Sequence, residues 1–192
     1  MSSVIQALPV RLADIRELFL ARGHLQYTGE PVSHLEHALQ CAAQAEREGA
    51  GDALISAALL HDLGHLMHEL GETPSARGVD DIHEYRVVPF LRSLFPDAVI
   101  DAIQRHVSAK RYLCAARPDY LAQLSDDSKR SLTLQGGVFS PEQANAFLEE
   151  PGAHDAIRLR VWDDLAKQPG LNTPDLDHFL HRAARCALVP TQ

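Results

Sequence analysis

The apolar positions of this chain recur at helical spacing over almost its whole length. In residues 10–21, Leu12, Ile15, Leu18 and Phe19 follow the i, i+3, i+4 spacing of an amphipathic helix. We find no convincing alternation of polar and apolar positions, no internal repeat and no low-complexity linker. The pattern therefore predicts an all-α protein.

Glycine, proline and capping residues divide this pattern into separate helices. Ser33 with Glu36, and Ser140 with Gln143, have the spacing of a capping box, which is typical of helix starts. Loops rich in turn-forming residues are expected at 27–31 and 71–78. The predicted helices cover residues 10–21, 34–48, 52–67, 81–95, 96–110, 118–124, 128–134, 140–150, 154–167 and 174–188.

The helix predicted at 52–67 differs from the others. Its apolar residues nearly encircle it, which is typical of a helix buried at the centre of a domain. Asp52 is the expected N-cap of this helix. We therefore expect one helical bundle over residues 1–192, built around a central buried helix.

Composition and charge narrow the class of protein. A chain of 192 residues with 45% hydrophobic and 23% charged residues is typical of one globular domain. The net charge of −8 argues against nonspecific binding to nucleic acid, which needs a basic face. Met1–Pro9 has no signal-peptide pattern, and no apolar run approaches the ~18 residues of a membrane span. We expect a cytoplasmic protein without a membrane span.

Three cysteines, Cys41, Cys114 and Cys186, share no CxxC spacing and leave one unpaired. Neither a disulfide framework nor a thiolate zinc site is indicated. We interpret all three as buried small side chains in a reducing compartment.

The end of the central helix carries candidate chemistry in His61, Asp62 and His65. Burying an ionised carboxylate costs several kcal/mol unless a cation or hydrogen bonds compensate, and a metal ion is the natural compensation. Taken alone, a His-Asp pair is more often an ion pair or a surface dipeptide than a metal site, but the apolar run at 57–60 favours burial here. Asp62 has two oxygens that can bridge two metals. His65 comes four residues after His61 and is expected on the same helix face. It is therefore a candidate for a metal ligand, for a residue that supports a ligand, or for a contact with the substrate.

Further candidate ligands stand on separate predicted helices. A single histidine on a helix does not indicate a metal site, and only the whole set of histidines and aspartates does so. Asp163 is followed directly by Asp164, and one residue turns a helical side chain by ~100°, so one of the two should face the metals. Imidazoles and carboxylates without thiolate suit iron or manganese better than structural zinc. The set allows two metals that share Asp62, with His37, His61 and Asp163 on one and His83 and His106 on the other.

Specific strings of residues follow one another along the chain in an order that is typical of one known family. These strings are residues 27–30, 35–42, 57–65, 83–84, 106–107, 109–113, 124–128, 135–137 and 160–163. With them the chain resembles the HD-domain superfamily of helical metalloproteins. It is most similar to the branch of mixed-valent diiron oxygenases that cleave organophosphonates, which share fold and iron chemistry with myo-inositol oxygenase.

This resemblance implies a mixed-valent Fe(II)/Fe(III) pair within a single HD domain, with a metal-binding core at about residues 27–167. Asp62 bridges the two iron ions. The implied ligands are His37, His61, Asp62 and Asp163 for one iron, and Asp62, His83 and His106 for the other.

The resemblance also implies substrate contacts. Tyr27 occupies an iron in the resting site, and Glu30 faces the amino end of the substrate. His65, Lys110, Ser128 and Arg160 match the positions that hold the phosphonate. A lysine, an arginine, a hydroxyl and an imidazole form a sound dianion pocket, because charge-assisted hydrogen bonds are strong. The implied catalytic residues are Tyr27, Glu30, His65 and Lys110.

The implied reaction is O2-dependent cleavage of the carbon–phosphorus bond in a (1R)-1-hydroxy-2-aminoethylphosphonate-type substrate. The products are phosphate and glycine, or glycine betaine from the trimethylammonio form. The acidic loop at 78–82 slightly favours the trimethylammonio form. We expect a monomer or a small homo-oligomer. Two alternatives remain: an HD phosphohydrolase acting on a nucleotide or phosphomonoester, and a metal-binding regulatory domain that senses a phosphorylated ligand without turnover.

Overall fold

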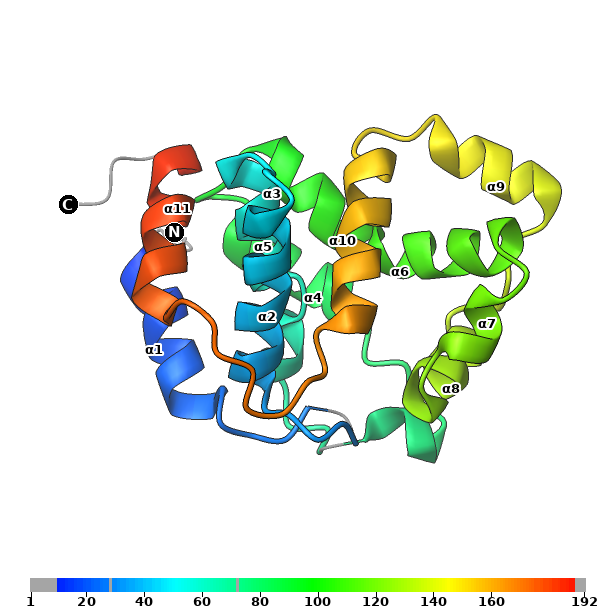
Figure 1. The fold of residues 1–192 in the computed structure, drawn as a ribbon, viewed down its shortest axis with the longest axis horizontal. Coiled ribbons are helices and arrows are strands. Elements are labelled where there is room, and N and C mark those ends of the chain that lie inside the picture. The colour runs from blue at the N-terminus through cyan, green and yellow to red at the C-terminus, as the bar shows by residue number, and fades with distance from the viewer. Residues whose placement is uncertain (1–9, 28, 72, 189–192) are drawn as a thin grey trace, which may run out of the picture.

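The computed structural model describes residues 10–27, 29–71 and 73–188, and in these ranges the regular elements are all helical (Figure 1). The all-α prediction is confirmed. Met1–Pro9 lies outside the described residues, so the prediction of one domain over 1–192 stays a prediction. The helices are α1 (Leu12–Arg22), α2 (His34–Arg47), α3 (Asp52–Leu60), α4 (His83–Arg86), α5 (Val88–Leu91), α6 (Asp97–Ala116), α7 (Tyr120–Gln123), α8 (Asp126–Leu134), α9 (Pro141–Leu148), α10 (Ala153–Leu165) and α11 (Leu176–Cys186), with 3-10 turns η1 (Leu63–Met67) and η2 (Pro74–Arg77).

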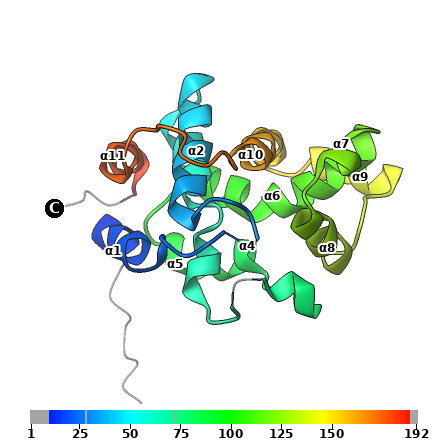
Figure 2. The same cartoon turned by 60° about the horizontal axis from the view of Figure 1, so that its bottom comes forward.

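Helix α3 is the centre of the bundle, as predicted. Residues 54–60 are all buried, and α3 packs against α2, α6, α10 and α11. Figures 1 and 2 show α1 and α11 on one side of this centre and α7, α8 and α9 on the other. The two residues that follow α3, His61 and Asp62, are buried as well.

The helix predicted at 52–67 is shorter than expected. It ends at Leu60, and the chain continues as the 3-10 turn η1, so His61 and Asp62 lie at the junction. Asp52 is the first residue of α3 and makes no capping bond; Gly51 is the N-cap, so that prediction was wrong. The Asp52 carboxylate instead pairs with Arg182 of α11 at 2.8 Å. Ser33 and Ser140 do form the predicted capping boxes.

The helix predicted at 81–95 is broken. Ile82 has a left-handed backbone (φ 47°, ψ 38°), which a helix cannot continue through, so α4 begins only at His83 and α5 follows as a separate turn. Such a conformation is unusual for a β-branched residue. The break turns His83 toward the end of α3.

Gly64 allows this approach. A side chain there would place its Cβ 2.2 Å from the backbone oxygen of His83, so only glycine lets η1 and α4 pack this closely. None of the helices in the part of the chain that the structure describes combines the length and apolarity of a membrane span.

Candidate metal centre

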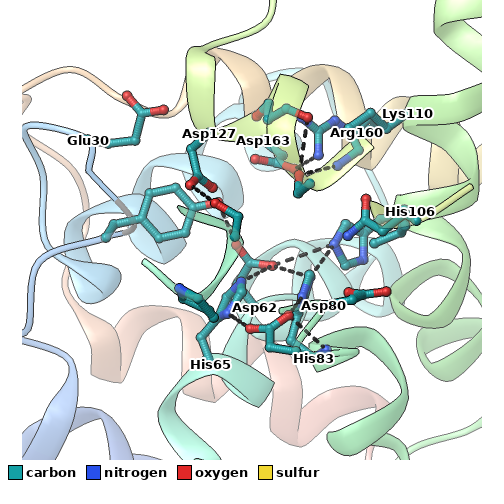
Figure 3. A pocket seen from close by; sticks show the side chains of 18 of the residues that line it. Glu30, Asp62, His65, Asp80, His83, His106, Lys110, Asp127, Arg160 and Asp163 are labelled. Atoms are coloured by element: carbon teal, nitrogen blue, oxygen red, sulfur yellow. Dashed lines mark hydrogen bonds and ion pairs between the residues drawn. The ribbon is translucent and has the colours of Figure 1, made fainter. Parts of the chain in front are cut away.

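Five elements bring the six predicted ligands to one point inside the bundle. Asp62 lies at the middle, and the other five surround it. Figure 3 shows Asp62 with His83, His106 and Asp163. All six are buried. The contributing elements are α2 with His37, the end of α3 with His61 and Asp62, α4 with His83, α6 with His106 and α10 with Asp163.

The Oδ2 side of Asp62 faces the first group. Asp62 Oδ2 is 3.5 Å from His37 Nε2 and 3.4 Å from His61 Nε2. The two Nε2 atoms are 3.3 Å apart, and Asp163 Oδ1 is 3.5 Å from His37 Nε2. Two imidazoles and two carboxylates thus converge on one small volume.

The Oδ1 side of Asp62 faces the second group. Asp62 Oδ1 is 3.2 Å from His83 Nε2 and 3.5 Å from His106 Nε2, and these two nitrogens are 3.0 Å apart. One carboxylate therefore stands between two pairs of facing imidazoles, which is the arrangement expected of a bridging ligand.

The hydrogen-bond partner of Nδ1 in each imidazole ring determines whether its Nε2 can bind a metal ion. Carbonyl and ionised carboxylate oxygens accept hydrogen bonds only, so each ring donates from Nδ1 and its neutral form has a lone pair at Nε2. Lone pairs that face each other at 3.0–3.3 Å repel unless a cation or proton lies between them. The Nδ1 partners are Ala166 O for His37 (2.8 Å), Ala58 O for His61 (3.0 Å), Ile103 O for His106 (2.6 Å) and Asp81 Oδ1 for His83 (2.9 Å).

Asp163 gives a second indication. Its Oδ1 is buried and has no hydrogen-bond partner among the described residues. Leaving a buried carboxylate oxygen unpaired is costly, and a metal ion supplies the missing partner. The donor set therefore fits metal ions held by nitrogen and oxygen.

Asp163 and Asp164 have different surroundings, as the helical turn between them requires. Asp164 receives hydrogen bonds from Tyr120 and Arg160, away from the histidines. Arg160 also pairs with Asp163 Oδ2 at 2.7 Å. The structure therefore places Asp163, and not Asp164, among the candidate ligands.

Tyr27 closes one side of this cluster. Its hydroxyl donates to Asp62 Oδ2 at 2.7 Å, and its ring stacks on His37 at 4.0 Å between centroids. Burial, together with the Asp62 and Asp163 carboxylates, raises the pKa of the phenol well above its usual value. Tyr27 thus stays protonated in this arrangement and shields the Asp62 carboxylate.

Lys110 and Arg160 line the same pocket and form its cationic side (Figure 3). Both are buried. Lys110 donates to Ser131 Oγ at 2.8 Å. Ser128 also lines the pocket, but its hydroxyl is bonded to Ser125. Ser131 is one helical turn beyond Ser128, a spacing that could have pointed to it in the sequence.

Asp81 is a second residue that sequence reasoning did not single out. It is buried and contacts three histidines: His83 Nδ1 at 2.9 Å, His65 Nδ1 at 2.5 Å and His68 Nε2 at 3.0 Å. His65 is thereby held with its Nε2 3.8 Å from Asp62 Oδ1. His65 is placed beside the cluster rather than within the pairs of facing imidazoles.

The three cysteines are free thiols in different surroundings. Cys41 is buried one helical turn from His37, with its Sγ 3.7 Å from His37 Nε2. Burial raises the pKa of its thiol. Cys41 lies with His37 and His61 in a group of atoms close enough to hold a metal ion, a neighbour that sequence reasoning did not consider. Cys114 and Cys186 are only partly buried, which corrects the expectation that all three are core residues.

An all-α fold with a buried centre of imidazoles and carboxylates defines a metal-binding protein of the histidine–aspartate type. Comparison with known proteins narrows this class. No model of a protein family matches the sequence. Two curated relatives are bacterial dioxygenases, and the chain belongs to their family, the phosphonate dioxygenases.

The first of these relatives, from Leisingera caerulea, is the [1-hydroxy-2-(trimethylamino)ethyl]phosphonate dioxygenase (glycine-betaine-forming). It is 40% identical over 84% of this chain and 83% of its own length. The second, from Gimesia maris, is a hydroxymethylphosphonate dioxygenase, 41% identical over 92% of this chain and 88% of its own. An uncharacterized protein of Acanthamoeba polyphaga mimivirus is 31% identical over 86% of this chain and 76% of its own. The chain is therefore an oxygenase of the organophosphonate-acting type.

Proposed function

We propose that this protein is an iron-dependent oxygenase that uses O2 to cleave the carbon–phosphorus bond of a 1-hydroxyphosphonate. The substrates named for the two dioxygenase relatives share a hydroxyl and a phosphonate on one carbon atom. The observation that carries the proposal is the placement of Asp62 between two pairs of facing imidazole nitrogens.

Two iron ions suit this arrangement. We propose His37, His61, Asp62 and Asp163 for one ion, and Asp62, His83 and His106 for the other. A mixed-valent Fe(II)/Fe(III) pair, when bound, supplies the activation of O2 and the oxidation of the substrate carbon. The side chains of the protein orient the substrate, stabilise the charge of the phosphonate and limit the access of water.

The phosphonate is proposed to bind on the cationic side of the pocket. Lys110 and Arg160 are both buried there, where charge-assisted hydrogen bonds to a dianion are strong. Arg160 is fixed by Asp163 and Asp164, so its guanidinium is oriented before substrate arrives. Ser131 holds the Lys110 ammonium, and Ser128 lies close by for a further contact.

Tyr27 and His65 complete the proposed site. Tyr27 lies over Asp62 and excludes water from the centre until substrate enters. His65, oriented by Asp81, presents its Nε2 beside the bridging carboxylate. From there we propose that it contacts a phosphonate or hydroxyl oxygen.

The overall reaction balances without an external reductant. A 1-hydroxyphosphonate, R–CH(OH)–PO3²⁻, and one O2 give R–COO⁻ and H2PO4⁻. The C–H and C–P bonds break, the carbon gains one oxygen atom and the phosphorus gains the other. The substrate supplies all of the electrons that reduce O2.

The group R differs between the two dioxygenase relatives. The acidic loop at 78–82, which led to the sequence-based expectation of the trimethylammonio form, contributes Asp80 to the pocket lining. Three substrates are therefore to be compared: the trimethylammonio compound, which gives glycine betaine, the primary amine, which gives glycine, and hydroxymethylphosphonate, which gives formate.

Iron content and oxygen dependence test the proposal. We expect about two iron ions per chain, a mixed-valent electron paramagnetic resonance signal, and phosphate release that matches O2 consumption one to one. Phosphate release from a phosphomonoester without O2 would instead establish the phosphohydrolase alternative. Zinc alone, with ligand binding and no turnover, would establish the regulatory alternative.

A further inference from the structure

Lys167 forms an ion pair inside the same pocket. It lies just after α10, and its Nζ is 3.0 Å from Glu30 Oε1. Each of the two side chains is only 15% exposed, and both line the pocket that contains Asp62. This is a half-buried pair within a binding site, unlike an exposed surface ion pair.

The backbone around Lys167 is held in place from both sides. The preceding residue, Ala166, accepts the His37 Nδ1 hydrogen bond at 2.8 Å. The following residue, Gln168, exchanges two hydrogen bonds with the Gln40 side chain at 2.8 and 3.0 Å. Because Gln40 and His37 are both on α2, the Lys167 ammonium is directed toward Glu30 by a fixed segment.

Glu30, and with it the ion pair, lies apart from the cationic side of the pocket. In Figure 3, Glu30 lies at the upper left and Lys110 and Arg160 at the upper right, with Asp62 below and between them. A phosphonate held by Lys110 and Arg160 therefore directs the remaining substituent of its carbon toward Glu30. Whatever charge stands at that end acts on the substituent.

Apart from Asp62, Asp81 and Asp163, which face the histidines, two further carboxylates line the pocket, and neither of them pairs with Glu30 or Lys167 among the described residues. Asp127 is engaged by Ser75 at 2.5 Å and by Arg130 at 3.0 Å. Asp80 lies on the other side of Asp62 from Glu30 in Figure 3. The charge nearest to Glu30 among these residues is thus the Lys167 ammonium, which balances it.

We infer that Lys167 neutralises Glu30 and selects a 1-hydroxyphosphonate without a cationic substituent, of the size and charge of hydroxymethylphosphonate. A quaternary ammonium that approached Glu30 would also approach the Lys167 ammonium, and such like-charge contacts discriminate strongly between ligands. A small neutral substituent leaves the ion pair intact. This inference rests on the proposed function and specifies its substrate class.

The test compares kcat/KM for hydroxymethylphosphonate and for the trimethylammonio substrate, using iron-loaded full-length protein. In the native protein we expect hydroxymethylphosphonate to be favoured by about tenfold or more. Lys167→Gln frees Glu30 and should raise kcat/KM for the trimethylammonio substrate about tenfold. The double variant Glu30→Gln, Lys167→Gln should remove that gain. Lys129→Gln is the matched control, because Lys129 does not line this pocket.

Lys167→Arg separates charge from packing. The arginine keeps the positive charge, so the native preference for hydroxymethylphosphonate should persist. If Lys167→Arg and Lys167→Gln lost this preference to the same extent, the inference would be overturned. Native preference for the trimethylammonio substrate, or a Lys167→Gln ratio within about twofold of the Lys129→Gln ratio, would also overturn it. The native ratio needs no variant to fold. Absence of turnover with every 1-hydroxyphosphonate would refute the proposed function itself, and turnover with the wrong ratio refutes only the inference.

Discussion

Asp81 accepts a hydrogen bond from His83 Nδ1 at 2.9 Å, and its other carboxylate oxygen lies 2.5 Å from His65 Nδ1. One buried carboxylate therefore orients two imidazole rings, and both rings turn their Nε2 toward Asp62 Oδ1, at 3.2 and 3.8 Å. A carboxylate behind a ligating histidine fixes the ring and increases its basicity. Asp81 thus acts on the centre through His83.

Asp81→Ala is expected to weaken binding of the iron proposed at His83 and His106. Loss of such a supporting carboxylate typically lowers metal affinity roughly 10- to 100-fold. Iron per chain, measured after competition with a chelator, should fall toward one. Asp80→Ala is the control, since the Asp80 carboxylate accepts from Ile82 N and makes no hydrogen bond or ion pair with a histidine among the described residues. Equal iron retention in the two variants would show that Asp81 does not support the centre.

Asp163 and Asp164 provide a paired test of the ligand assignment. Asp163→Ala should reduce iron content, because it removes a carboxylate that faces His37. Asp164→Ala should keep the iron and instead weaken substrate binding, since it frees Arg160. Iron analysis combined with KM for the phosphonate distinguishes the two. Loss of iron in Asp164→Ala alone would reverse the assignment.

Asp62 is the proposed bridging ligand, and its removal should affect both of the proposed iron sites. Asp62→Ala takes away one oxygen from each pair of imidazoles. We expect binding of the iron pair to be lost, whereas His106→Ala should remove one ion preferentially. Retention of both irons in Asp62→Ala, by metal analysis and electron paramagnetic resonance, would refute the bridging role.

Much of the helical fold, and the location of its central buried helix, could be predicted from the sequence because these features depend on the periodicity of apolar residues. The buried run of α3 led to His61 and Asp62, and the capping boxes located the starts of α2 and α9. The six candidate ligands do lie together. Periodicity led to His61 and Asp62, whereas the choice of Asp163 over Asp164 and the complete set came from the resemblance to the family.

Other features depend on contacts between residues distant in the chain, which periodicity does not report. Lys167 is directed toward Glu30 by hydrogen bonds that join residues 166–168 to α2. The break before α4 depends on the left-handed Ile82, a conformation that its residue type does not favour. Tertiary packing overrides the local helical pattern there, so a helix over 81–95 was predicted in error.

Gly64→Ala should destabilise the fold and disturb the centre together. The added Cβ would lie 2.2 Å from the His83 backbone oxygen, so α4 must move. Overpacking of this kind costs roughly 1–3 kcal/mol, and His83 would shift away from Asp62. The midpoint temperature of thermal unfolding and the iron content per chain should both fall. Gly51→Ala is the control: its Cβ meets nothing within 4 Å, and its free energy of unfolding should change by less than about 1 kcal/mol.

Lys110 predicts how activity depends on pH. Burial, and then the neighbouring Arg160 guanidinium, lower the pKa of Lys110 to about 8. Below that pH the ammonium is charged and attracts the phosphonate dianion; above it the charge is lost. Because kcat/KM reports groups of the free enzyme, it should fall by about tenfold per pH unit above pH ~8.

Lys110→Arg isolates this effect. A guanidinium stays protonated over the whole range, so the alkaline fall should disappear even where the absolute rate is lower. Lys129→Arg, at a lysine outside the pocket, should retain the native profile. The profiles are best measured with hydroxymethylphosphonate, whose substituent does not titrate. If the fall persisted unchanged in Lys110→Arg, the titrating group would lie elsewhere, and Lys110 would not be the cation that receives the phosphonate.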